Sequence, residues 1–239
     1  MNYNEGFKMK LFRFLCLSTL LVISNLAYSD TADHHPETKL FKTIPLSAHI
    51  FMLQGKGGNI ALITGEQGLV LIDADYAEMS EALAGELKKY GGLEQVRYLI
   101  NTHWHGDHTQ GNEMIGQYAP IIAHDNVRSR LLTRQEIKQF GMVSEPYVSH
   151  AVPSITYNKS LTLTVNGETL EIVHFANGHT DGDSIVFLKQ SNIVHMGDHF
   201  FSGFYPFVDV GTGGNVRTMA DNVAAVLDRI DDDTVVIPG

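Results

Sequence analysis

Cysteine is almost absent from this sequence of 239 residues, since Cys16 is the only one. We predict that residues 1–29 are a secretory signal peptide, because basic residues precede a short apolar run at 14–26 and the small residues Ala27 and Ser29 follow it. Removal of that segment leaves a chain that can form no disulfide and offers no thiolate to a metal ion. Any metal site in it must use nitrogen and oxygen ligands.

Basic residues are also scarce, with 17 lysines and arginines against 27 acidic residues and a formal net charge of −10. An acidic chain without a basic patch is a poor partner for nucleic acid, so we expect a small-molecule substrate instead. No long hydrophobic run is present, and the one at 14–26 is too short for a comfortable membrane span. We therefore predict a periplasmic or secreted protein without a stable span after signal cleavage; an uncleaved anchor is the alternative.

Residues 30–43 are polar and predict a flexible lead-in, and residues 44–239 are long enough for one sizeable domain. Each half of that domain has several strand-like runs and then a helical one. Strands are expected at 49–54, 59–64, 69–73, 96–100, 121–123, 161–165, 169–175, 184–188, 192–196 and 234–237, and helices at 77–90, 124–139 and 216–230. This order predicts an α+β fold in which two sheets pack face to face with helices outside.

Three histidines and an aspartate fall within six residues directly after the strand at 96–100: His103, His105, Asp107 and His108. Imidazole nitrogen and carboxylate oxygen are ligands that zinc and similar divalent ions prefer. Residues i and i+2 of an extended segment point the same way, so His103 and His105 can chelate one ion while Asp107 and His108 face a second. A solvated polar loop that happens to be rich in histidine is the disfavoured alternative.

Two later segments offer further donors. His179 lies between glycines in residues 177–183, and glycine lets the backbone bring an imidazole close to an ion. Asp198 follows Gly197 after a predicted strand, and its two oxygens can bridge two cations. His199 next to it is either a support behind the ligands or a group that faces the substrate. Taken alone each segment is typical of a turn, but their order after the first motif favours a metal site.

With these three motifs together, the sequence resembles the metallo-β-lactamase-fold superfamily of metallo-hydrolases from about residue 49 onward. The resemblance implies a four-layer αβ/βα sandwich with the metal site at one edge between the two sheets. It also implies two divalent metal ions, with Zn²⁺ as the expected metal and Fe or Mn as the alternatives. His103, His105 and His179 would hold the first ion, Asp107 and His108 the second, and Asp198 would bridge both.

Two departures from the family pattern matter. Members usually complete the second site with a histidine after a strand that ends in Pro-Gly or similar, and this sequence stops at Pro238-Gly239. We interpret it as truncated at its C-terminus. Asp198 stands where the archetypal β-lactamases commonly have cysteine or serine, which indicates the broader hydrolases, such as thioesterases and lactonases.

The resemblance therefore implies an exported hydrolase that uses a metal-bound hydroxide on an ester, thioester, lactone or amide bond. A bound metal lowers the pKa of water from ~15.7 towards ~7, and Asp107 would orient the hydroxide or carry a proton. The alternatives are a β-lactamase proper, a mononuclear iron oxygenase or persulfide-oxidising enzyme, and a metal-binding protein without catalysis. The aromatic stretch at 200–207 either walls a substrate pocket or is buried packing.

Overall fold

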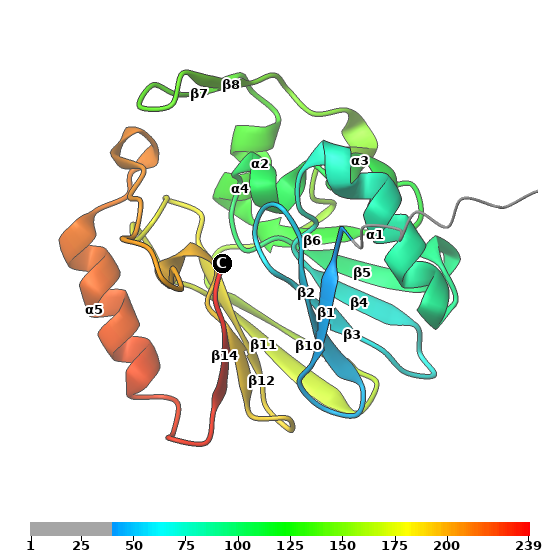
Figure 1. The fold of residues 1–239 in the computed structure, drawn as a ribbon. Helices are drawn as coiled ribbons and strands as arrows, with labels where there is room; N and C mark the ends of the chain where they lie inside the picture. Colours follow the sequence, from blue (N-terminus) through cyan, green and yellow to red (C-terminus); the bar gives the residue numbers. More distant parts are fainter. Residues whose placement is uncertain (1–39) are drawn as a thin grey trace, which may run out of the picture. The chain divides into compact units, whose positions relative to one another are not determined.

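Residues 40–239 are described by this computed structural model, and their strands form two large β-sheets and a separate hairpin (Figure 1). The first sheet has seven strands in the order β1 (Lys42–Pro45), β2 (Ile50–Gln54), β3 (Ile60–Ile63), β4 (Leu69–Ile72), β5 (Val96–Ile100), β6 (Ile121–His124) and β9 (Ile155–Tyr157). From β1 to β4 neighbouring strands pair antiparallel, whereas β4, β5, β6 and β9 pair parallel. The carboxyl ends of these four parallel strands consequently meet at one edge of the sheet.

The second sheet has five strands in the order β10 (Ser160–Val165), β11 (Glu168–His174), β12 (Ser184–Leu188), β13 (Ile193–His195) and β14 (Val235–Ile237). Asn166 and Gly167 connect β10 to β11 with positive φ angles of 53° and 76°, the backbone that an Asn-Gly hairpin turn requires. Strands β7 (Gln135–Ile137) and β8 (Met142–Ser144) pair only with each other, and Figure 1 shows this hairpin standing apart from both sheets.

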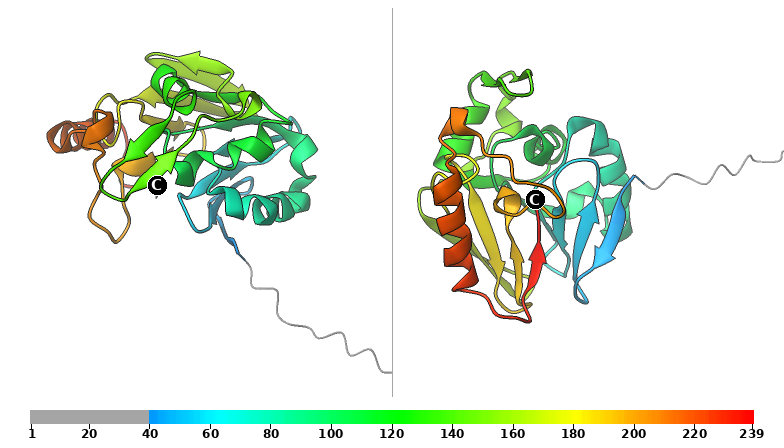
Figure 2. Two further views of the ribbon diagram at one scale, coloured as in Figure 1. Left: turned by 90° about the horizontal axis from the view of Figure 1, so that it is seen from above. Right: turned by 60° about the vertical axis from the view of Figure 1, so that its left-hand side comes forward.

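The two large sheets pack face to face and helices cover their outer sides, which gives the four layers that the sequence predicted. Side chains of both sheets share the core between them, among them Ile72, Ile100, Ile172 and Val186. The helices are α1 (Ser80–Leu87), α2 (Gly106–Thr109), α3 (Asn112–Ile115), α4 (Asp125–Leu131) and α5 (Val216–Leu227). Buried side chains of α1 pack on the first sheet and those of α5 on the second, and the two helices lie at opposite sides of the molecule (Figure 2).

The predicted helix at 124–139 is wrong in its second half. Helix α4 ends at Leu131, and β7 begins at Gln135. The Gln135 side-chain amide donates to the backbone oxygens of Arg130 and Thr133, at 3.3 Å each, and so connects the start of β7 to the segment after α4. Ile137 is then buried beside α4, as a hairpin strand rather than a helical turn.

The predicted lead-in is also wrong from Phe41 onward, because that side chain is buried in the core under α1 and β1 begins at Lys42. The rest of the lead-in and the predicted signal peptide lie outside the described residues. Among residues 40–239, no helix combines the length and the apolar character needed to cross a membrane.

The layer of α1 against the first sheet can be tested with two leucines that differ in burial. Leu83 in α1 is fully buried, whereas Leu227 in α5 is 62% exposed. We expect Leu83→Ala to lower the free energy of unfolding by about 2–5 kcal/mol, because it leaves a cavity. Leu227→Ala should change it by no more than about 0.5 kcal/mol. Urea unfolding followed by circular dichroism measures both, and equal losses would contradict this packing.

Candidate metal centre

The predicted metal ligands come together at the edge where the parallel strands of the first sheet end. His103, His105, Asp107 and His108 follow β5, and a loop between β11 and β12 brings His179 to the same place. Asp198 follows β13 of the second sheet. The site therefore lies at the edge shared by the two sheets, as the sequence predicted.

The donor atoms form two groups, within each of which all atoms lie within 4.8 Å of one another. The first consists of His103, His105, His179 and Asp198, and the second of Asp107, His108 and Asp198. Asp198 uses both oxygens: Oδ2 lies 3.3 Å from His179 Nε2, and Oδ1 lies 3.1 Å from His108 Nε2. All six side chains that the sequence singled out are thus in one cluster, with Asp198 between the two groups.

Each of the four imidazoles has an oxygen atom on its outer side that accepts a hydrogen bond from its outward nitrogen. Thr102 Oγ1 lies 3.1 Å from His103 Nδ1, and because that hydroxyl donates to Asp73, it accepts from the ring. The other three contacts are His105 Nε2 to Asp209 Oδ2 at 3.2 Å, His108 Nδ1 to Asp73 Oδ2 at 2.8 Å, and His179 Nδ1 to the Phe207 backbone oxygen at 2.8 Å. These partners fix the tautomers, so that one unprotonated nitrogen of each ring points inward.

The inward atoms fit a cation. His179 Nε2 and His105 Nδ1 lie only 2.9 Å apart, and with both outward nitrogens protonated, two lone pairs face each other. Among the described residues, His103 Nε2, His108 Nε2 and Asp198 Oδ1 are buried polar atoms without a hydrogen-bond partner. Buried polar groups are rarely left unpaired, and this donor set is the one that divalent metals bind. The residues present therefore fit a divalent metal site.

The charges of the cluster favour the same conclusion. Burial lowers the pKa of His103 well below its ordinary value and also lowers that of His105, so both rings stay neutral, as ligands must be. Burial would lower the pKa of His108 too, but the charges of Asp198, Asp107 and Asp73 raise it well above its ordinary value. The carboxylates thus require a positive charge at this place, which a bound cation supplies.

Two aspartates at the end of β4 support the motif from behind, and the sequence analysis missed them as functional residues. Asp73 accepts from the Thr102 backbone and hydroxyl, at 2.8 Å each, as well as from His108. Asp75 accepts from the backbone amides of Lys56 and Gly57. Both aspartates have positive φ angles, 67° and 59°. Residues with a side chain seldom adopt this backbone conformation, and it often marks functional sites.

The loop between β2 and β3 covers the second donor group. The Gly58 amide donates to the Asp107 backbone oxygen at 3.1 Å, and a Cβ added to Gly58 would lie 2.3 Å from His108 Cε1. Only glycine allows so close an approach of the backbone to the imidazole. Because Asp75 holds the preceding amides, this loop keeps Asp107 and His108 in place.

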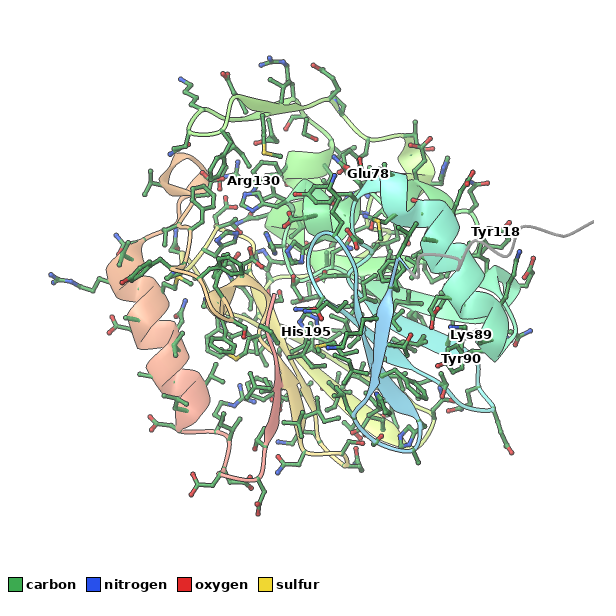
Figure 3. All side chains as sticks on the ribbon, viewed as in Figure 1. Glu78, Lys89, Tyr90, Tyr118, Arg130 and His195 are labelled. Carbon is green, nitrogen blue, oxygen red and sulfur yellow. The ribbon has the colours of Figure 1, made fainter. Side chains whose placement is uncertain are left out.

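Polar contacts also fix the loop that carries His179. The Asp183 carboxylate accepts from the backbone amides of His179 and Thr180, and burial raises the pKa of Asp183 to about 6. Asp181 forms a two-pronged ion pair with Arg130 of α4, with both nitrogen to oxygen distances at 2.7 Å. Arg130, which Figure 3 places below the β7–β8 hairpin, also donates to the Thr212 backbone oxygen.

The other histidines of residues 40–239 stay outside the two donor groups. His195 is fully buried and bonds the Asn59 backbone oxygen, and His124 caps α4 by accepting from the Asn126 amide. His199 lies behind the ligands: burial lowers its pKa to about 3, and its Nε2 is 3.1 Å from Asn222 of α5. His174 stacks on His124 with ring centroids 3.6 Å apart.

Asp209 is a third residue whose role the sequence did not predict. Its side chain is 1% exposed and accepts from His105, from Thr212 Oγ1 at 2.7 Å and from the Gly211 amide at 3.1 Å. Its backbone amide donates to the His179 backbone oxygen at 2.9 Å. Asp209 therefore joins the segments of two histidines of the first donor group.

The last residue of the printed sequence lies beside the second donor group. Asn59 donates to the backbone oxygens of Pro238 and Gly239 at 3.2 Å, and a Cβ on Gly239 would lie 2.1 Å from Asp198 Oδ1. In Figure 1 the C-terminus is marked at this edge of the sheets. A histidine after Gly239, which the resemblance implies, stays a prediction.

Comparison with known proteins agrees with this fold and with the family that the sequence resembles. Residues 53–239 match the family model of the metallo-beta-lactamase superfamily, and the chain belongs to that superfamily of metallo-hydrolases. It is 29% identical over 188 residues to the probable metallo-hydrolase MJ0888 of Methanocaldococcus jannaschii, a match covering 76% of this chain and 85% of the relative. It is 28% identical to the lactamase-like protein adaB of Aspergillus niger over 67% of this chain, and it spans 44% of that relative's length.

Solved structures show the same fold. A metallo-beta-lactamase from Pontibacter korlensis superposes with a TM-score of 0.66 at 19% identity, covering 83% of this chain and 90% of its own. The metallo-beta-lactamase with a HARLDQ motif from Cronobacter sakazakii has a TM-score of 0.66 at 17% identity, with 82% and 77% covered. These superpositions establish the shared architecture, but at identities this low they do not identify the substrate of this protein.

Metal binding can be followed through Trp104, the only tryptophan of the sequence, whose ring lies 4.5 Å from that of His105. We expect Zn²⁺ added to metal-free protein to change the Trp104 fluorescence until the site is filled. His103→Ala should weaken this binding by more than about 100-fold, because it removes a ligand. The exposed His150 provides the matched control, His150→Ala. Equal zinc affinity in the two variants would contradict the assigned donor group.

The role of Asp209 predicts a separate effect on affinity. We expect Asp209→Asn to weaken zinc binding about 10–100-fold, because the charge behind His105 is lost. Competition with a chromogenic chelator measures this, and thermal unfolding of the metal-free protein shows whether the fold is affected. Asp221→Asn, at an exposed position of α5, is the control. A lower unfolding temperature with unchanged metal affinity would assign Asp209 to the fold alone.

Proposed function

We propose that this protein is an exported hydrolase that requires two divalent cations and cleaves an ester, thioester, lactone or amide bond. Zn²⁺ is the metal that we expect. The observation that carries this proposal is the pair of donor groups that share the two oxygens of Asp198. Bound there, divalent cations lower the pKa of a water molecule towards ~7 and polarise the carbonyl of the substrate. The superfamily of the chain and its metallo-hydrolase relative support the same chemistry.

Within the site, Asp107 is the residue suited to proton transfer. The other donor side chains are almost fully buried, whereas the Asp107 side chain is 31% exposed. Its Oδ2 lies 3.6 Å from His108 Nε2, so the carboxylate reaches both the second donor group and the solvent. We infer that it orients the attacking water and delivers a proton to the leaving group.

The donor set favours a general hydrolase over a β-lactamase proper. Asp198 offers a carboxylate at the position where the archetypal β-lactamases commonly have cysteine or serine. The lactamase-named proteins compared above are at most 28% identical to this chain. Turnover of a chromogenic cephalosporin at a rate above that of every ester, thioester and lactone would overturn this preference.

Export follows from the signal peptide proposed at residues 1–29. A periplasmic or secreted location also agrees with a chain whose single cysteine lies inside that segment. The mass of the protein recovered from the periplasm or the medium tests this: we expect it to begin after Ser29. A full-length protein retained in the cytoplasm or the membrane would refute export without affecting the proposed chemistry.

Metal removal and loss of Asp107 should both abolish most of the turnover. We expect a chelator to remove the activity against a panel of esters, thioesters and lactones, and Zn²⁺ to restore it. Asp107→Ala should lower kcat/KM by about 100- to 10,000-fold, the usual contribution of a positioned acid or base. Asp228→Ala, at an exposed aspartate after α5, is the matched control.

Metal analysis of the purified protein separates this proposal from its main competitors. A single iron with little zinc, together with consumption of oxygen in the presence of a persulfide, would assign the protein to the iron enzymes. Tight metal binding without turnover of any compound in the panel would leave a metal-binding protein. Wild-type activity in Asp107→Ala would refute the role given to that carboxylate.

A further inference from the structure

Exposed apolar side chains are concentrated in two short segments. Of the fifteen large hydrophobic side chains that are exposed among the described residues, eight lie within residues 140–148 and 200–210, which together are a tenth of the described chain. Phe140 is 60% exposed, Phe204 81% and Tyr205 98%. Single exposed apolar residues are ordinary, but a contiguous cluster of them marks a binding surface.

The second segment leads directly to the metal centre. The ring centroid of Phe207 lies 5.8 Å from that of His179 and 6.1 Å from that of His105. Phe201 lies on His179 as well, with centroids 5.9 Å apart. The aromatic surface therefore begins at the first donor group and extends outward from it.

The first segment joins the same surface through Phe140, in the turn between β7 and β8. Its ring centroid is 4.8 Å from that of Phe207, so the hairpin and the 200–207 loop are in contact. Gly203, Phe204 and Tyr205, in the same loop as Phe201 and Phe207, line a surface hollow of about 400 Å³. We call Phe140, Phe201, Phe204, Tyr205 and Phe207 the aromatic rim.

Polar contacts hold the bases of both segments. Arg130 donates to Gln135 at the start of β7, at 3.0 Å, and to the Thr212 backbone oxygen at 3.1 Å. The Phe207 backbone oxygen accepts from His179. A surface fixed in this way loses little conformational freedom when a ligand packs on it.

The side chains of the rim are all aromatic and carry no positive charge, which favours an apolar ligand. The loop at 200–216, which carries four of the five, contains no lysine or arginine, while the hairpin that carries Phe140 contains Lys138. We propose that the substrate has a large apolar acyl group, which packs on the aromatic rim while its scissile carbonyl lies at the metal centre. This inference rests on the proposed hydrolase function and names the substrate class of that site.

A lipid bilayer and a second copy of the chain are the other occupants that an exposed aromatic surface can bind. The net charge of −10 opposes binding to an anionic membrane. Continuity with the ligands His105 and His179 instead ties the rim to the molecule on which the site acts. Both alternatives become outcomes of the test.

The test compares p-nitrophenyl esters of acetyl, butyryl and octanoyl groups with the zinc-loaded protein. We expect kcat/KM to rise at least about tenfold from acetyl to octanoyl, because each methylene that leaves water favours binding. In the double variant Phe204→Ser, Tyr205→Ser, the octanoyl to acetyl ratio should fall at least about threefold. Both side chains are exposed, so the fold does not depend on them.

Two exposed side chains outside the rim provide the matched control. Tyr118, which Figure 3 shows on the side of α1 and α3, is 47% exposed, and Leu227 in α5 is 62% exposed. The double variant Tyr118→Ser, Leu227→Ser should keep the wild-type ratio. A ratio near one in the wild-type protein, or an equal fall in both double variants, would overturn the role of the rim.

Failure of the proposed function gives a different result. If no ester, thioester or lactone is cleaved, binding of the neutral dye Nile red and its displacement by octanol still report on the rim. Binding that the Phe204→Ser, Tyr205→Ser variant loses supports an apolar ligand, and equal binding in both proteins refutes it. Flotation with vesicles, or a change of oligomeric state in that variant, would assign the rim to a membrane or a second copy.

Discussion

The buried donor atoms of the site repel one another, and the rest of the structure is built to hold them together against this repulsion. Two imidazole nitrogens, His105 Nδ1 and His179 Nε2, face each other at 2.9 Å, and the oxygens of Asp198 lie 3.3 Å from His179 Nε2 and 3.1 Å from His108 Nε2. While each ring carries only its outward proton, these inward atoms have no hydrogen to share, and the surrounding carboxylates raise the pKa of His108 well above its ordinary value. The rest of the fold is needed to hold this cluster together, and a cation at its centre is what makes the cluster favourable.

The sandwich supplies the rigidity that this task requires. Parallel strands β4, β5 and β6 end at the same edge, so that the backbone after β4 can bind the backbone after β5 through Asp73 and Thr102. The second sheet brings Asp198 to that edge, and a largely apolar core between the sheets fixes the distance between them. Short loops and short helical turns after the strands carry the donors, among them Asp107 and His108 in α2, and the strands determine their positions.

The sequence predicted the parts of the site whose signal is local. His103 to His108 form a dense motif, and the glycines around His179 and before Asp198 make both segments recognisable. Asp209 lies 104 residues from its partner His105, and nothing in its own surroundings indicates that contact. The role of Asp73 could have been predicted. It ends the strand expected at 69–73, which is a parallel neighbour of the strand before His103, and parallel neighbours end at the same edge of a sheet. The predicted helix 124–139 was too long because the local helical composition continues past Leu131, where α4 ends.

The contacts of Asp73 have a consequence for both donor groups. One carboxylate touches Thr102, which supports His103 of the first donor group, and also His108 of the second. The same carboxylate therefore orients an imidazole in each of the two donor groups. Asp209, by contrast, contacts His105 and the segment of His179, both of the first group. A change at Asp73 would disturb both groups at once, whereas a change at Asp209 would act on the first group alone.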